Sequence, residues 1–256
     1  MATVPNPASS IFTFILITIF YFVIKYKTPD SLSKIITIVY IVAIISTQIT
    51  INASLAKAMC DNNKANSTAL LATIFPIVFI FGILYLFLLI FPGWLEPFSN
   101  TFGYAMTKLN GIRDFLGKLL NRPLPTMDKS ITKAINNIYS DPSIFINQFN
   151  YDDKEAFDTI WNRNLQGNIF IKEATIGSNY YNDFRNYVKL KDIVGTFVWF
   201  LLVGILVTTR SYNYIIAQPC SLSPDKSDKS LQNYTDTKDN NKPELNVTPP
   251  GYSYKR

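Results

Sequence analysis

The chain has 256 residues, of which 48% are apolar and 16% charged, with a net charge of +6 and no histidine. Without imidazole it lacks the usual general base near neutral pH, and its two cysteines are too few for an ordinary zinc site. Its basic residues are spread along the chain, which argues against specific nucleic-acid binding and favours anionic lipid head groups as partners.

Four apolar runs predict an all-α integral membrane protein with four transmembrane helices, because about 20 apolar residues cross the hydrocarbon core. The third run is the longest, and it contains Pro76, a residue type that can kink a helix. A signal peptide is the alternative for the first run, but no basic residue precedes Lys25 and no cleavage motif follows, so we expect an uncleaved span. The runs cover residues 9–24, 35–56, 69–91 and 193–209.

These runs divide the chain into four regions. A three-span membrane region covers 1–91, an extramembrane module covers 92–192, and the fourth transmembrane helix covers 193–216. The remaining residues, 217–256, are rich in Pro, Ser, Asp, Asn and Lys. This segment has too few apolar residues to offset the entropy of the chain, so we expect a disordered tail.

Charge asymmetry predicts the orientation of the spans. Lysine and arginine are more numerous beside the span ends on the face that carries the 25–34 loop and the 92–192 module. The positive-inside rule therefore places the module in the cytoplasm and the N-terminus and tail on the opposite side. Glycosylation triplets agree, although chance could produce them in segments so rich in Asn, Ser and Thr; they begin at Asn52, Asn66, Asn233 and Asn246.

Both cysteines, Cys60 and Cys220, fall on the side opposite the module. An oxidising compartment there would allow a disulfide that ties the 57–68 loop to the start of the tail.

The stretch after the third run, FPGWLEPFSNTFGY, is rigid, aromatic and almost uncharged. Pro92 and Gly93 are expected to stop the third helix, and Pro97 to keep the chain extended. Aromatic rings prefer head-group depth, so this elbow would fix the direction in which the module leaves the bilayer. An ordinary interfacial turn is the alternative. The aromatic residues concerned are Trp94, Phe98, Phe102 and Tyr104.

Residues 104–120 show the spacing of one amphipathic helix, with Met106, Leu109, Ile112, Leu116, Leu119 and Leu120 on its apolar face. Its basic residues, Lys108, Arg113 and Lys118, lie elsewhere around the helix, where they could contact lipid phosphates. A core helix of a small domain is the equal alternative.

The rest of the module is predicted to be mostly helical. Helices are expected over 128–139 and 152–165, with a turn and a short helix after Asp141, while 167–174 is ambiguous. Asp152 and Asp153 are adjacent, which favours helix capping over an acid–base pair. A final helix should run from about residue 180 directly into the fourth span.

Motifs for catalysis are absent from the sequence: it has no P-loop, GxGxxG, GxSxG, HExxH or CxxC pattern. We therefore expect no enzyme, cofactor or metal site, and a structural or adaptor role instead. Two polar residues within the second run, Gln48 and Asn52, could line a pore, but such residues more often join helices through hydrogen bonds.

Two blocks, residues 70–104 and 188–220, resemble predicted membrane proteins of large nucleocytoplasmic DNA viruses of the chlorovirus, phycodnavirus and mimivirus-like groups. The resemblance covers about a quarter of the chain. It rests on the strings FPGW and PFSNTFGY in the first block, and on Lys191-Asp192, Trp199, Ser211-Tyr212-Asn213-Tyr214 and Cys220 in the second.

This resemblance implies a virion protein of an internal membrane that lies beneath an icosahedral capsid and derives from the host endoplasmic reticulum. Assembly on the cytoplasmic face would direct the 92–192 module towards minor capsid proteins and the tail towards the genome. Two alternatives remain open. One is an oligomeric channel or a pore used to enter cells, and the other is a host-membrane remodelling protein absent from particles.

Overall fold

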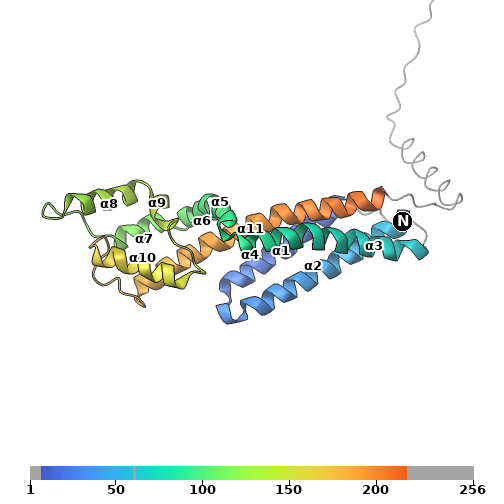
Figure 1. Ribbon diagram of the computed structural model, residues 1–256, viewed down its shortest axis with the longest axis horizontal. Helices are drawn as coiled ribbons and strands as arrows, with labels where there is room; N and C mark the ends of the chain where they lie inside the picture. The colour runs from blue at the N-terminus through green and yellow to red at the C-terminus, as the bar shows by residue number, and fades with distance from the viewer. Residues whose placement is uncertain (1–6, 60–61, 218–256) are drawn as a thin grey trace, which may run out of the picture.

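The computed structural model describes residues 7–59 and 62–217 and is all-α in architecture. Figure 1 shows an elongated molecule with a bundle of long helices at one end and a smaller helical module at the other. Within the described residues, four helices are long and apolar enough to cross a membrane. The predicted fold class is therefore confirmed, while the tail, Cys60 and Cys220 lie outside the described residues.

The spans are longer than their apolar runs. The first is α1 (Pro7–Lys27) and the second is α2 (Asp30–Met59). The third joins α3 (Asn62–Pro76), a π-helical segment η1 (Ile77–Gly82) and α4 (Ile83–Ile90). The fourth belongs to α11 (Asn179–Ile216). Polar flanking turns therefore extend each helix beyond the hydrocarbon, where water or head groups can solvate them.

Pro76 changes the winding of the third span without ending it. The helix continues through the proline and widens into the π-helical segment η1 immediately after it. Proline lacks an N–H and its ring crowds the preceding turn, so a local change of helical winding is an expected accommodation.

The bundle is organised like a membrane protein, with apolar side chains on its outer surface. Ile38, Val42, Leu86 and Ile90 all expose more than half of their accessible surface. Its interior is aromatic, and the ring of Phe200 lies 5.4 Å from that of Phe22 and 5.2 Å from that of Phe81. An apolar outer surface of this kind is stable in lipid and would be a liability in water.

The module consists of short helices packed on the first half of α11. It contains η2 (Pro92–Leu95), α5 (Glu96–Phe98), η3 (Ser99–Gly103), α6 (Tyr104–Leu109), α7 (Ile112–Leu119), α8 (Lys129–Ser140), α9 (Pro142–Ile146) and α10 (Lys154–Gln166). Their shared core is aromatic and centres on Trp161, whose indole N–H donates to the Ala174 carbonyl at 2.8 Å. Residues 167–174 form turns and one isolated bridge between Leu120 and Phe170, which answers the ambiguity left by the sequence.

Three aspartates cap helices of the module, and the cap of α10 is the role that the sequence predicted for the Asp152–Asp153 pair. Asp128, Asp141 and Asp153 accept hydrogen bonds from the first-turn backbone of α8, α9 and α10, respectively. Such caps satisfy N–H groups that have no partner within the helix. The hydrogen bonds from Ser130 also hold the pKa of the Asp128 carboxyl below its ordinary value.

The prediction of a single amphipathic helix over 104–120 is wrong. The chain breaks at Asn110 and Gly111 into α6 and α7, and Gly111 has a φ of +88°, which glycine adopts at no steric cost. Leu109 is 83% exposed, whereas Ile112 and Leu116 are buried in the module core. The break turns α7 inwards, so its apolar face meets protein, as the core-helix alternative expected.

The prediction of an extended chain at Pro97 is also wrong. Phe91, with φ −124° and ψ 74°, ends the third span, and the chain then re-forms helical turns from Pro92 onwards. Pro97 lies in the first turn of α5, where its fixed φ suits a helix and its missing N–H costs nothing. The elbow is therefore a compact run of helical turns.

Candidate functional site

The candidate site is the junction where α11 passes from the module into the spans. At about 1.5 Å per residue, its 38 residues extend about 57 Å, nearly twice the roughly 30 Å hydrocarbon thickness. Phe184 and Val188 on its first half belong to the module core, while Trp199 and Val203 on its second half belong to the bundle core. One continuous helix thus belongs to both hydrophobic cores.

Glycines bring the elbow into backbone contact with α11. A Cβ added to Gly103 would lie only 2.8 Å from the carbonyl carbon of Lys191, and one added to Gly195 would lie 2.6 Å from the Ser99 backbone nitrogen. Real Cβ atoms do not approach this closely, so only glycine, which has no side chain, fits at both positions. Small residues allow helices to pack at such short distances.

A buried ion pair on α11 is hydrogen-bonded to the module loop at the same level. Lys191 is 3% exposed, and its ammonium lies 2.9 Å from an Asp192 carboxylate oxygen. The other carboxylate oxygen of Asp192 accepts the Tyr151 backbone N–H at 2.8 Å. A paired and hydrogen-bonded carboxylate is the arrangement in which a charge tolerates burial, so this cluster fixes the 147–152 loop.

The hairpin between α1 and α2 is tied to the module by a second polar cluster. Asp30 accepts a hydrogen bond from the Tyr151 hydroxyl at 2.9 Å and pairs with Lys189 at 3.4 Å. Lys189 also donates to the Thr28 carbonyl at 3.4 Å. The Arg185 guanidinium lies over the Tyr151 ring at 4.6 Å. The module therefore contacts the first two spans as well as the fourth.

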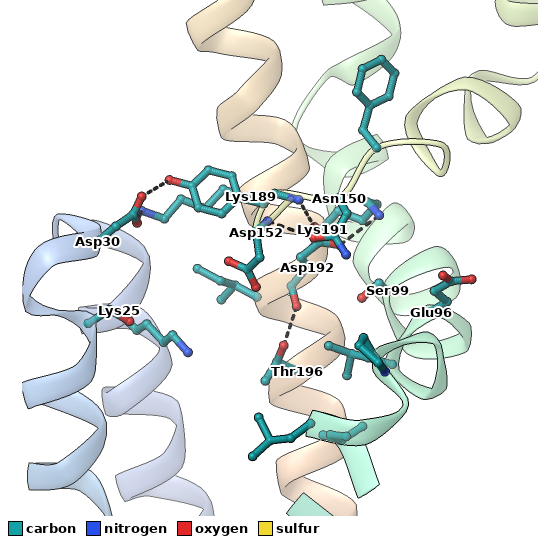
Figure 2. A pocket seen from close by; sticks show the side chains of 18 of the residues that line it. Lys25, Asp30, Glu96, Ser99, Asn150, Asp152, Lys189, Lys191, Asp192 and Thr196 are labelled. Carbon is teal, nitrogen blue, oxygen red and sulfur yellow. Dashed lines mark hydrogen bonds and ion pairs between the residues drawn. The ribbon is translucent and has the colours of Figure 1, made fainter. Parts of the chain in front are cut away.

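A cleft of about 730 Å³ opens between these contacts. Figure 2 shows Lys25 and Asp30 on the hairpin at one side, Glu96 and Ser99 of the elbow at the other, and Asp192 of α11 between them. Apolar residues of α2 and α4 line its remaining walls, including Ile38 and Leu89. The cleft therefore has a charged mouth and an apolar part beside the spans.

The aromatic residues of the predicted elbow divide between two environments. Trp94 and Phe102 are each 54% exposed, and Trp94 stacks on Phe87 at 5.4 Å between ring centroids. Phe98 packs against the bundle core and Tyr104 against the module core. Two of the four rings are thus free to meet head groups, and the other two hold the elbow to protein.

The three basic residues proposed to contact head groups do not form one row. Lys108 lies on α6, whereas Arg113 and Lys118 lie on α7, beyond the break at Gly111. Arg113 donates to the Tyr139 carbonyl of α8 at 3.3 Å, so its guanidinium lies against another helix of the module. Lys118 lines a hollow with Tyr26 at the end of the first span. Of the three, Lys118 is the residue that the structure places beside a span end.

Gln48 and Asn52 are both buried, and each bonds to a different neighbouring span. The Ser10 hydroxyl donates to Gln48 at 2.9 Å, and Asn52 donates to the Thr73 hydroxyl at 2.8 Å. This is the helix-joining arrangement that the sequence favoured over a pore lining. Asn52 is 2% exposed, so the folded bundle as described has no room for a glycan on its side chain.

Replacing Asn52 with Leu is expected to lower the stability of the bundle by about 1 kcal/mol, because one interhelical hydrogen bond in a membrane protein contributes about that much. Thermal unfolding of the purified chain in detergent measures the change. Thr50→Val is the matched control, since Thr50 is exposed and bonds only within its own helix. Equal melting temperatures for Asn52→Leu and Thr50→Val would contradict the packing role. A difference in bilayer conductance between the reconstituted Asn52→Leu variant and the unaltered chain would contradict it as well.

Several residues of the junction were not singled out from the sequence as site residues. Gly103, Lys191 and Gly195 lie inside the two blocks that carry the resemblance, but Tyr151 lies outside both and does not stand out by any motif. The available signal was Lys191 and Asp192, which directly precede the apolar run at 193–209, since charges at the edge of a span need partners. Comparisons of the chain with protein-family models, with curated proteins and with solved structures returned no match.

Proposed function

We propose that the protein is a structural membrane protein that holds its 92–192 module at a set position on one face of a bilayer. The supporting observation is that α11 contributes to both hydrophobic cores, with Phe184 in the module and Trp199 in the bundle. A flexible linker would let a module drift over the membrane, whereas a continuous helix transmits position and direction. Such rigidity suits a tether between a membrane and a protein shell.

The sequence resemblance gives this proposal its setting, the internal membrane of a large DNA virus. In that setting the module links the bilayer to the icosahedral capsid through minor capsid proteins. Its outer end offers a contact point: the loop before α8 lies farthest from the spans in Figure 1 and exposes 58% of Leu124. Leu124, Pro125 and Met127 line a hollow there beside Lys129 and Lys133.

Cross-linking mass spectrometry on intact particles tests the proposal. Links to capsid proteins are expected from exposed lysines of the module, with Lys129 at the outer loop the most productive. Lys191 provides an internal control, because its buried ammonium should form no link in the folded protein. Further exposed lysines to follow include Lys108, Lys118 and Lys154.

Two results would contradict this proposal. Links from the module only to genome-associated proteins would invert the expected orientation, since the module would then face the interior of the particle. Absence of the protein from purified particles, measured by quantitative proteomics, would favour a role in remodelling host membranes instead.

A further inference from the structure

We propose that the cleft between α2, α4 and α11 binds a phospholipid whose head group carries a primary ammonium, the chemistry of phosphatidylethanolamine. The lipid would come from the leaflet on the module's side of the membrane. This inference depends on the four spans and on the junction geometry. It does not depend on the proposed tether function, because a protein of any role with these spans would present the same cleft.

The position of the cleft is suited to a lipid. It lies where α1 ends, α2 begins and α4 gives way to the elbow, which is the level at which head groups meet the spans. Figure 1 shows α2 diverging from α4 towards the module, and side chains of both helices line the cleft. Ile38, Leu88 and Leu89 form its apolar side, so an acyl chain can lie against the spans while its head group enters the mouth.

The charges around the cleft divide into paired and unpaired groups. Eight charged residues line it, and four of these form the pairs Lys189–Asp30 and Lys191–Asp192. The side chains that remain form no ion pair within the described part of the chain; they are Lys25, Lys34, Glu96 and Asp152.

The unpaired charges are separated by sign. Lys25 and Lys34 belong to the hairpin of the first two spans, whereas Glu96 belongs to the elbow and Asp152 to the module loop. The two unpaired lysines therefore lie on the hairpin side of the cleft, while the two unpaired carboxylates come from the elbow and the module loop, with Asp192 between them in Figure 2. A zwitterionic head group matches this arrangement, with its phosphate towards the lysines and its amine towards the carboxylates.

A buried acceptor favours a primary amine over choline. Asn147 lines the cleft, and its buried Oδ1 has no hydrogen-bond partner among the described residues. A primary ammonium has three N–H donors, as lysine does, and can satisfy this oxygen together with a carboxylate. Choline has no N–H, and its usual recognition requires a cage of open aromatic faces.

The aromatic residues of the cleft do not provide such a cage. Arg185 and Lys189 occupy positions over the Tyr151 ring at 4.6 and 5.2 Å, and Phe149 is buried in the module core. Tyr85 is the remaining aromatic residue that lines this cleft. The volume of about 730 Å³ lies within the usual 300–1,000 Å³ range of small-molecule sites.

Native mass spectrometry of the purified full-length chain in mild detergent tests the site. Phosphatidylethanolamine, phosphatidylcholine and phosphatidylglycerol with identical acyl chains are titrated separately. We expect phosphatidylethanolamine to bind most tightly, and the double variant Lys34→Gln with Glu96→Gln to weaken its binding by about tenfold, since two charge-assisted contacts are lost. Lys57→Gln, at the opposite end of α2, is the matched control and should leave binding unchanged.

A charge reversal distinguishes amine recognition from general attraction to lipid. Glu96→Lys adds a third unpaired cation and should change the preference from phosphatidylethanolamine to phosphatidylglycerol. Equal binding of the three lipids by the unaltered chain would overturn the proposal, as would an unchanged preference in Glu96→Lys. Tightest binding of phosphatidylglycerol by the unaltered chain would show that the lysines alone select the lipid, which also overturns it. The tether proposal would stand in each case.

Discussion

Replacing Gly103 with Ala is expected to separate the elbow from α11 and loosen the module from the spans. The added methyl group would overlap the backbone of Lys191, with its carbon 2.8 Å from the carbonyl carbon. A backbone carbonyl in the middle of a helix cannot rotate away as a side chain could. Overpacking typically costs about 1–3 kcal/mol, and we expect the upper part of that range here.

Two measurements follow the effect of Gly103→Ala. Thermal unfolding in detergent reports the loss of stability, and electron paramagnetic resonance reports the distance between spin labels at Lys34 and Lys129. Both cysteines are first replaced by serine, so that the labels occupy only the chosen positions. The unaltered chain should give a narrow distance distribution, and the variant a broader one, because the contact that orients the elbow is lost.

Gly117→Ala is the matched control for this substitution. Gly117 lies on the exposed side of α7, and a Cβ added there would have no neighbour within 4 Å. Alanine favours helix over glycine by up to about 1 kcal/mol, so this variant should be as stable as the unaltered chain or slightly more stable. An unchanged distance distribution in Gly103→Ala would show that the glycine contact does not set the direction of the module.

The spans could be predicted from the sequence because each depends on local composition. A continuous apolar run has few options other than a buried or membrane-spanning helix, and the four predicted runs correspond to the four long apolar helices of the structure. The cap predicted at the Asp152–Asp153 pair was equally local, since Asp153 bonds to a backbone group only three residues further along the chain.

The arrangement of the module depends on contacts between distant residues, and these leave little trace in the sequence. Asp30 and Tyr151 are 121 positions apart, and their hydrogen bond follows no periodic pattern. The break at Gly111 was missed because the apolar spacing continues through it, although an Asn-Gly pair is a common turn signal. The apolar positions of α6 and α7 therefore suggested one face where the chain makes two.

The same dependence on contacts between distant residues explains why the prediction for Pro97 failed. Two prolines five positions apart suggested an extended chain, because proline disfavours helix at the residue before it. In the structure Pro97 begins a helical turn, and the elbow packs closely against α11 through Gly103 and Ser99. Close tertiary packing thus supports helical turns that local preference alone would not predict.

Replacing Trp161 with Ala is expected to unfold the module while the spans stay helical. Trp161 is fully buried and donates its indole N–H to Ala174. Its ring stacks on Phe157 and lies tilted against Phe170 and Phe184. Truncating a buried tryptophan costs about 3–5 kcal/mol, and the Ala174 carbonyl would lose its partner as well. A module of this size has only a small core, so such a loss takes up much of its stability.

Limited proteolysis and circular dichroism of the purified chain together locate the effect of Trp161→Ala. Sites between α7 and α10 should become cleavable, whereas the helical signal of the spans should persist, because the bundle core is separate and contains Trp199 and Phe200. Leu109→Ala is the control, since Leu109 is 83% exposed and its truncation leaves the core intact. If the spans melted together with the module, α11 would carry cooperativity between the two cores as well as position. Protection of the module in Trp161→Ala would contradict the central place of this residue in its core.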